Sequence, residues 1–183
     1  EEGDDLIIDG MFQDNFGANE TLSDVFNPDG RFGGGWYRRY HLNMKTGELQ
    51  SQQVMDTECE FPTFNTPLTG SRNEVTYTAC SVDNGANSFF NGISRVTRDG
   101  DATVVTLPPG FYGSEPVFVP KINAAKEDDG YLMEVVYDGF EHKSELQIYR
   151  ADDVNDQVCS LKLKHHLPHQ FHGFYTPEVF STT

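Results

Sequence analysis

The sequence predicts an all-β fold, and three observations carry that prediction. Short runs of β-branched and aromatic residues recur along the chain, each bounded by Gly, Asp, Asn or Pro. The 17 Gly and 9 Pro residues favour turns over helices. No window of about 11 residues shows the 3.6-residue apolar period of an amphipathic helix. A chain of 183 residues, 37% of them hydrophobic, can bury the core of one domain.

The strand-like segments follow one another with turn residues between them. In order they are Leu6–Ile8, Trp36–Leu42, Glu48–Met55, Glu74–Ser81, Ile93–Thr97, Thr103–Leu107, Pro116–Val119, Tyr131–Tyr137, Glu145–Tyr149 and Val158–Leu163. Residues 45–48 and 98–101 predict hairpin turns, and residues 128–130 open a third strand pair. The longest irregular segment runs from Asp9 to Gly35. Short antiparallel strands of this kind suit a sandwich, a barrel or a propeller, and their spacing does not choose among the three.

Charge and cysteine content narrow the range of partners. Thirteen Lys and Arg against 29 Asp and Glu give a net charge of −16, which argues against nucleic acid because that binding needs Lys and Arg clusters. An aromatic content of 13% argues against a disordered acidic chain. No run of about 18 apolar residues predicts a membrane span. The cysteines are odd in number and widely spaced, so we expect a reducing, intracellular compartment. They are Cys59, Cys80 and Cys159.

A histidine cluster near the end of the sequence is a candidate metal site, because neutral imidazole is a common ligand for Zn, Fe and Cu. The cluster comprises His165, His166, His169 and His172. Pro168 prevents the helix that would place three of these rings on one face. On a strand, alternate residues point to opposite sides, so at most a subset can converge. A complete site therefore needs ligands from elsewhere, and surface or packing roles are the simpler reading of any single ring.

Two glutamates stand out because apolar residues and prolines flank them. Glu60 lies in the run 58–62 and Glu115 in the run 113–120. If these neighbours pack inward, each carboxylate needs a partner, because an unpaired buried carboxylate is costly. An imidazole N–H would satisfy it and leave the second ring nitrogen free for a metal. Pairing with Arg, or capping of a turn, is the equally open alternative.

Several segments, taken in order, resemble the C-terminal part of the carotenoid cleavage oxygenase family, which includes apocarotenoid oxygenases, lignostilbene dioxygenases and the retinoid isomerase. The resemblance rests on their joint order and spacing. The segments are residues 6–10, 36–42, 45–47, 59–62, 114–120, 127–132, 143–146 and 167–173. It implies a seven-bladed β-propeller, of which residues 1–183 would form three to four C-terminal blades of a single domain.

The resemblance also implies a site and an activity. Family members hold a non-haem iron, Fe(2+), with four histidines, three of which are oriented by glutamates. His172 matches the last iron ligand, and Glu60 and Glu115 match two of the glutamates. The other ligands belong to the family's N-terminal portion, so this chain alone is expected to be inactive. The whole protein would be a dioxygenase that cleaves a C=C bond of a carotenoid, apocarotenoid or stilbene-type substrate to carbonyl products.

Two alternatives stay open on the same residues: a catalytically silent propeller that acts as a binding scaffold, and a retinoid-type isomerase. The partners implied by the resemblance are an apolar polyene or stilbene-like molecule and O2, with peripheral membrane contact by the whole protein. The expected location is the cytoplasm or a plastid.

Overall fold

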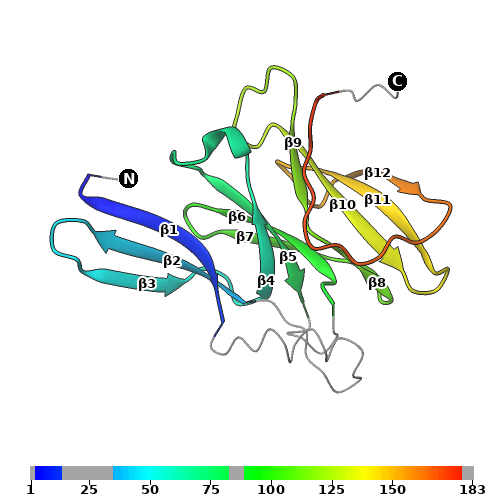
Figure 1. Cartoon of the computed structure of the whole chain (residues 1–183), viewed down its shortest axis with the longest axis horizontal. Coiled ribbons are helices and arrows are strands. Elements are labelled where there is room, and N and C mark those ends of the chain that lie inside the picture. The colour runs from blue at the N-terminus through cyan, green and yellow to red at the C-terminus, as the bar shows by residue number, and fades with distance from the viewer. Residues whose placement is uncertain (1–2, 14–34, 83–88, 179–183) are drawn as a thin grey trace.

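The computed structural model describes residues 3–13, 35–82 and 89–178, and this part of the chain forms strands and one single-turn 3-10 helix (Figure 1). The elements are β1 (Asp5–Phe12), β2 (Trp36–Asn43), β3 (Leu49–Gln53), β4 (Glu58–Thr63), η1 (Thr66–Leu68), β5 (Val75–Ser81), β6 (Gly92–Thr97), β7 (Ala102–Thr106), β8 (Phe111–Tyr112), β9 (Val117–Pro120), β10 (Gly130–Asp138), β11 (Lys143–Arg150) and β12 (Gln157–Lys162). In the described residues, no helix is long and apolar enough to cross a membrane.

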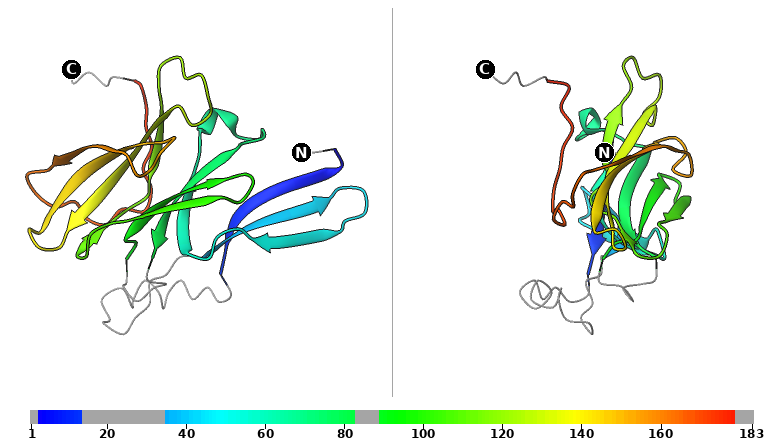
Figure 2. Two further views of the ribbon diagram at one scale, coloured as in Figure 1. Left: turned by 180° about the vertical axis from the view of Figure 1, so that it is seen from behind. Right: turned by 90° about the vertical axis from the view of Figure 1, so that its right-hand side faces the viewer.

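The strands form three antiparallel sheets in chain order. The first has the order β1-β2-β3 and the second β4-β5-β6-β7. In the third, β10 lies between β11 and the pair β8 and β9, and β12 forms the outer edge. The three predicted turns are confirmed, because they join β2 to β3 and β6 to β7 and begin β10. Figures 1 and 2 show the sheets side by side, in an open arrangement that agrees with a partial β-propeller.

Each of the ten predicted segments overlaps a strand, but two strands were missed and one expected loop is partly wrong. The missed strands are β4 and β8. In β4 the pairing register shifts between Glu60 and Thr63, around Pro62, which breaks the sequence pattern of a regular strand. The expected loop begins later than predicted, because β1 continues to Phe12. The remainder of that loop, residues 14–34, lies outside the described residues.

The second sheet lies between the other two, and its inner strands β5 and β6 are buried on both faces. One face packs on the first sheet through an apolar cluster that includes Tyr37, Cys59 and Cys80. The opposite face packs on the third sheet through a cluster that includes Tyr77 and Leu132. This explains why every residue of β5 is buried, whereas β10 alternates between buried and half-buried positions.

Candidate metal centre

The segment that follows β12, residues 163–178, carries the predicted ligand and runs back across the sheets without forming a strand (Figure 1). It is attached at several points. Leu167 N–H donates to Ser144 Oγ over 2.8 Å, and the His169 ring stacks on Phe89 with centroids 4.2 Å apart. Desolvation by its aromatic neighbours lowers the pKa of His169, although the residue still exposes part of its surface. These contacts fix the path of the chain just before His172.

The structure brings His172 and Glu115 together, although 57 positions separate them in the sequence. His172 Nδ1 lies 3.3 Å from Glu115 Oε1, and the Gly173 N–H donates to Glu115 Oε2 over 2.6 Å. The Glu115 side chain is 17% exposed and the His172 side chain 76% exposed. One carboxylate therefore contacts both the ring and the backbone that carries it.

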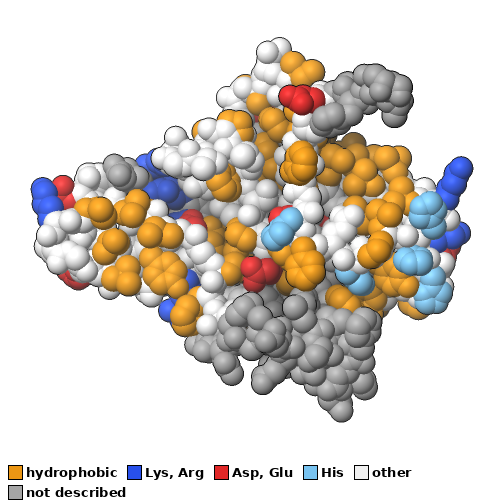
Figure 3. All heavy atoms as spheres, in the orientation of Figure 1, with side chains coloured by type: hydrophobic (Ala, Val, Ile, Leu, Met, Phe, Trp, Pro, Cys, Tyr) orange, Lys and Arg blue, Asp and Glu red, His pale blue; other side chains and the backbone are white. Residues whose placement is uncertain are grey.

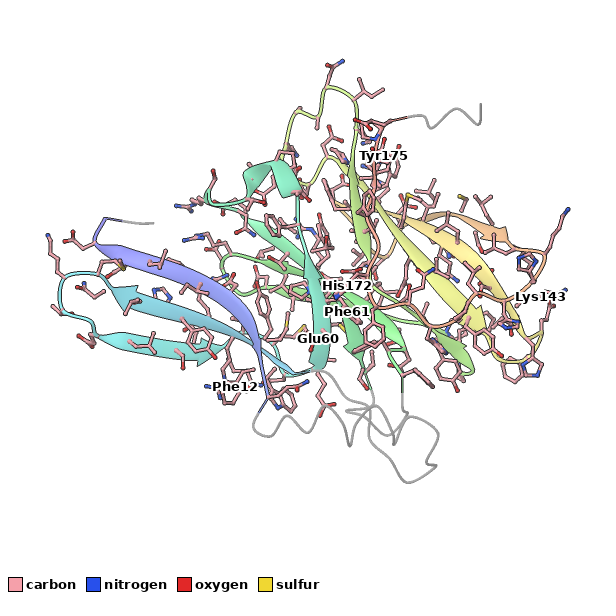
Figure 4. The ribbon with its side chains drawn as sticks, viewed as in Figure 1. Phe12, Glu60, Phe61, Lys143, His172 and Tyr175 are labelled. Atoms are coloured by element: carbon pink, nitrogen blue, oxygen red, sulfur yellow. The ribbon has the colours of Figure 1, made fainter. Side chains whose placement is uncertain are left out.

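This contact determines what the ring can do. An ionised carboxylate only accepts hydrogen bonds, so Nδ1 is the nitrogen that carries the proton. Nε2 then keeps its lone pair, and this is the arrangement found for a metal-binding histidine whose other nitrogen donates to a carboxylate. In Figure 4, His172 lies at the centre of the molecule beside Phe61, with Glu60 close by on β4.

A break in the third sheet presents Glu115 to the histidine. β8 and β9 both pair with the same side of β10, so residues 113–116 leave the ladder between them. Gly113 begins this break and lies against the carboxyl group of Glu134. A Cβ atom at position 113 would lie 2.1 Å from Glu134 Oε1, which explains the glycine.

A bulge in β4 presents Phe61 and Glu60 on the other side. Phe61 has a φ of 56°, a left-handed conformation that a bulky residue rarely adopts. Its ring meets the His172 ring edge-on at 5.6 Å and 90°, and it meets Phe90 at 5.6 Å and 71°. Phe61 and Phe90 therefore form an aromatic wall, of which Phe61 contacts the exposed ring of His172. Figure 3 shows apolar side chains spread over the same face.

The two predicted glutamates have different surroundings. Burial raises the pKa of Glu60, while the backbone N–H groups of Phe61 and Gly35 oppose the shift. Among the described residues, backbone N–H groups and not His172 are the partners of Glu60, so any histidine that it orients is a different one. Glu115, in contrast, already has the ring and the Gly173 N–H as donors.

The other histidines are not brought into the site. His165 and His166 are exposed, and His142 Nδ1 lies 2.8 Å from Tyr137 Oη at the turn between β10 and β11. Within the described residues, no three side chains of the His, Cys, Asp or Glu type converge as a metal site would require. What this part of the chain offers a metal is therefore one imidazole, that of His172.

Three consecutive acidic residues, Glu127 to Asp129, have structural roles. Asp128 pairs with Arg95 at 2.6 Å, and Asp129 pairs with Lys121 at 2.6 Å. The Glu127 carboxylate accepts backbone N–H groups at the start of β5. These contacts tie residues 121–130 to the second sheet and leave no oxygen cluster for a cation.

Comparison with known proteins decides the family. The family model described as "Retinal pigment epithelial membrane protein" matches residues 1–177. The chain belongs to this family. The resemblance to carotenoid cleavage oxygenases is thereby confirmed, since curated members among its relatives carry those names.

Two relatives and two solved structures show how much of the family the chain represents. It is 27% identical over 176 residues to apocarotenoid-15,15'-oxygenase of Synechocystis sp., covering 94% of this chain and 36% of that protein. It is 32% identical over 152 residues to a carotenoid 9,10(9',10')-cleavage dioxygenase of Crocus sativus, covering 75% and 28%. The chain therefore spans about a third of the length of these relatives.

The structural likeness covers the same range. A crystal structure of cobalt-substituted Synechocystis ACO matches 94% of this chain and 36% of its own chain, with a TM-score of 0.82 and 27% identity. A structure of an ACO/RPE65 chimera matches 96% and 37%, with a TM-score of 0.84 and 27% identity. The all-β, partial-propeller prediction is confirmed by this likeness.

Sequence reasoning missed the aromatic residues near His172. Phe61 contacts the His172 ring, Phe90 contacts Phe61 from behind, and Phe89 stacks on His169 in the segment before His172. Aromatic residues are frequent in any core, so their type carries no site signal. A signal existed only for Phe61, where Pro62 in an otherwise strand-like run indicates a bulge.

Proposed function

We propose that this chain is part of a non-haem Fe(II) dioxygenase that cleaves a C=C bond of a carotenoid, apocarotenoid or stilbene-type substrate to two carbonyl products. The observation that carries the proposal is the contact between His172 Nδ1 and Glu115 Oε1 at 3.3 Å. The names of the curated relatives supply the reaction class and the polyene type of substrate. Residues 1–183 would be the C-terminal part of the propeller domain.

The donor set of His172 fits one position in an iron site. Its ring is exposed, and when Nδ1 donates to Glu115 the lone pair on Nε2 is available to a metal. Imidazole nitrogen is a suitable ligand for iron. The remaining ligands would come from parts of the protein outside this chain. Glu60 of this chain would orient one of them. Fe(II), when bound, supplies the O2 activation that the cleavage needs.

The residues of this chain would position and shield rather than react. Glu115 would fix the tautomer and the plane of the His172 ring, and the bond from Gly173 would fix the backbone beside it. Phe61, supported by Phe90, would exclude water from one side of the ring. An apolar polyene suits such a wall, because burying apolar surface is its main source of binding energy.

The test of His172 uses the longer protein that contains this chain. His172→Ala should abolish iron-dependent turnover of an apocarotenoid. His166→Ala is the matched control, because His166 is exposed in the same segment and should leave iron content and turnover unchanged. Full iron content and turnover in His172→Ala would refute the ligand assignment.

The two glutamates are tested by removing their charge. Glu115→Gln and Glu60→Gln should each weaken iron binding or activity by about 10- to 100-fold, as the loss of ligand-orienting carboxylates does. Glu141→Gln, an exposed carboxylate near the β10–β11 turn, serves as the control. Incorporation of labelled oxygen into the products separates a dioxygenase from an isomerase that works at the same site.

We further propose that the protein acts inside the cell, in the cytoplasm or a plastid, with peripheral contact to the membrane that holds its substrate. The apolar nature of polyenes supports this proposal, since such substrates reside in lipid. Fractionation of cells that express the whole protein would test it, with recovery in an oxidising extracellular fraction as the contrary result.

A further inference from the structure

Two buried cysteines face each other across neighbouring strands of the second sheet. Cys59 on β4 is the register partner of Cys80 on β5. Directly opposed residues of an antiparallel pair point to the same face of the sheet. Both side chains belong to the cluster between the first and second sheets, and both are 0% exposed.

The hydrogen-bond pattern shows which kind of pair this is. Cys59 exchanges both backbone hydrogen bonds with Gly35, each 2.8 Å long, on the side of β4 that faces away from β5. The N–H and C=O of one strand residue point to the same side, so neither group of Cys59 bonds to Cys80. The Cys80 carbonyl accepts from Asn91, next to β6, and thus also faces away from β4.

Cys59 and Cys80 are therefore a non-hydrogen-bonded pair, the type in which opposed Cα atoms lie about 4.5 Å apart and side chains are closest. Disulfides need a Cα separation of about 4.4 to 6.8 Å. The pairing thus satisfies this requirement without movement of either strand. Cys159, on β12 of the third sheet, has no cysteine opposite it, because its partner is Ile148.

We propose that Cys59 and Cys80 form a latent redox site, a dithiol that a peroxide converts into a cross-strand disulfide. One thiolate attacks a peroxide oxygen, the O–O bond breaks, and a sulfenic acid and one water result. The second sulfur attacks the sulfenic sulfur, so that the S–S bond forms as the S–O bond breaks and a second water leaves. The two sulfurs lose two electrons and the two peroxide oxygens gain them.

The surroundings of the two thiols slow their oxidation without preventing it. Burial raises the pKa of Cys59 to about 12 and that of Cys80 to about 11, which suppresses the reactive thiolates. Cys59 Sγ–H donates to Met11 Sδ at 3.4 Å, and the Thr78 hydroxyl lies 3.4 Å from Cys80 Sγ. The pair would therefore remain reduced while the core is closed, and would react when a local opening admits peroxide while β4 and β5 stay paired.

Closing this bond would act on the strand that carries a proposed site residue. Glu60 follows Cys59 directly and projects to the opposite face of β4. A link to β5 at Cys59 would restrict the backbone just before the bulge at Phe61. The inference does not depend on the proposed iron chemistry, because the two thiols and a peroxide suffice for the reaction.

The experiment uses the chain with Cys159→Ser, which removes the half-exposed thiol and prevents links between molecules. The protein is treated with hydrogen peroxide at several urea concentrations below its unfolding midpoint, alkylated and analysed by mass spectrometry. We expect loss of both alkylation sites together, a mass lower by two hydrogen atoms and a linked peptide pair that contains Cys59 and Cys80. Because the thiols react only when the core opens locally, the reaction should be slower than that of a free cysteine without urea and should speed up as urea is raised toward the midpoint.

A single replacement in the same background, Cys80→Ala, is the matched control, and it should abolish the loss of two hydrogens. The main measurement keeps both Cys59 and Cys80, so it does not depend on a substitution in the core that could unfold the chain. Two thiols that stay alkylatable at every urea concentration, or that gain oxygen separately without a link, would overturn the proposal.

Discussion

Glu134 offers the sharpest test of how this chain is held together. Its side chain is 1% exposed, on the face of β10 that packs against the second sheet, and it lies beside Leu132 and Val136. Within the described residues, neither of its carboxyl oxygens has a hydrogen-bond partner of ordinary geometry. Burial raises its pKa from 4.5 to about 8, and the Ser114 backbone N–H opposes this shift without cancelling it. We predict that Glu134→Gln stabilises the chain at neutral and alkaline pH.

The magnitude follows from linkage between protonation and folding. Between pH 4.5 and 8 the folded chain keeps the proton on Glu134 while the unfolded chain loses it. The folded state then binds more protons, so the free energy of unfolding falls by about 1.4 kcal/mol per pH unit as the pH rises. Relative to pH 4.5, the free energy of unfolding is therefore lower by on the order of 3 kcal/mol at pH 7 and by on the order of 5 kcal/mol above pH 8. Below pH 4.5 the group is protonated in both states and contributes no slope.

Urea unfolding of the chain and of its Glu134→Gln variant, from pH 4.5 to pH 8.5, measures this difference. Glutamine keeps the shape of the neutral acid and cannot ionise, so the two stabilities should agree near pH 4.5 and separate steadily above it. Glu48→Gln, which changes an exposed carboxylate, is the control and should leave the slope unchanged. If the profiles of the chain and of Glu134→Gln run parallel through pH 8, the burial argument fails.

Three further predictions concern stability and are read from urea midpoints. Gly113→Ala should cost about 1–3 kcal/mol, because its Cβ would collide with Glu134 Oε1, and Glu134→Ala in the same chain should recover part of that loss. Asp9→Asn should lower the free energy of unfolding by about 2–3 kcal/mol, because it weakens the two hydrogen bonds, 2.7 and 2.9 Å long, that the buried guanidinium of Arg39 donates to Asp9. An unchanged midpoint would contradict this. Phe61→Gly should be about 1 kcal/mol more stable than Phe61→Ala, since both lose the ring and only alanine is strained at a φ of 56°; equal midpoints would show that this strain is absent.

The sequence predicted most strands because their alternation and their turns are local properties. β4 was missed because residues 61 and 62 interrupt the strand pattern: Phe61 has a left-handed backbone and residue 62 is a proline. β8 escaped because it has two residues, which pair only with the end of β10. Both missed strands flank the site, as expected where the chain departs from regular geometry in order to present a side chain.

The site itself was only partly predictable for a related reason. The resemblance selected His172 and Glu115, and no periodicity joins two residues that lie 57 positions apart. Their contact depends on the break between β8 and β9 and on the attachment of the last segment at Ser144 and Phe89. These are long-range features of the packed sheets.

The three glutamates of this region show why a perturbed pKa does not by itself identify a functional carboxylate. Glu134 has the largest shift among these carboxylates, to about 8, but it is sealed in the core, where only the Ser114 backbone N–H opposes the shift. Glu115 is bonded to a ring nitrogen and a backbone N–H, so it is equipped to orient a ligand. Glu60 lies between these cases, because burial raises its pKa while only backbone N–H groups oppose the shift. An imidazole N–H brought to Glu60 would favour its charged form, so its pKa should fall when the rest of the site is present, whereas that of Glu134 should not change.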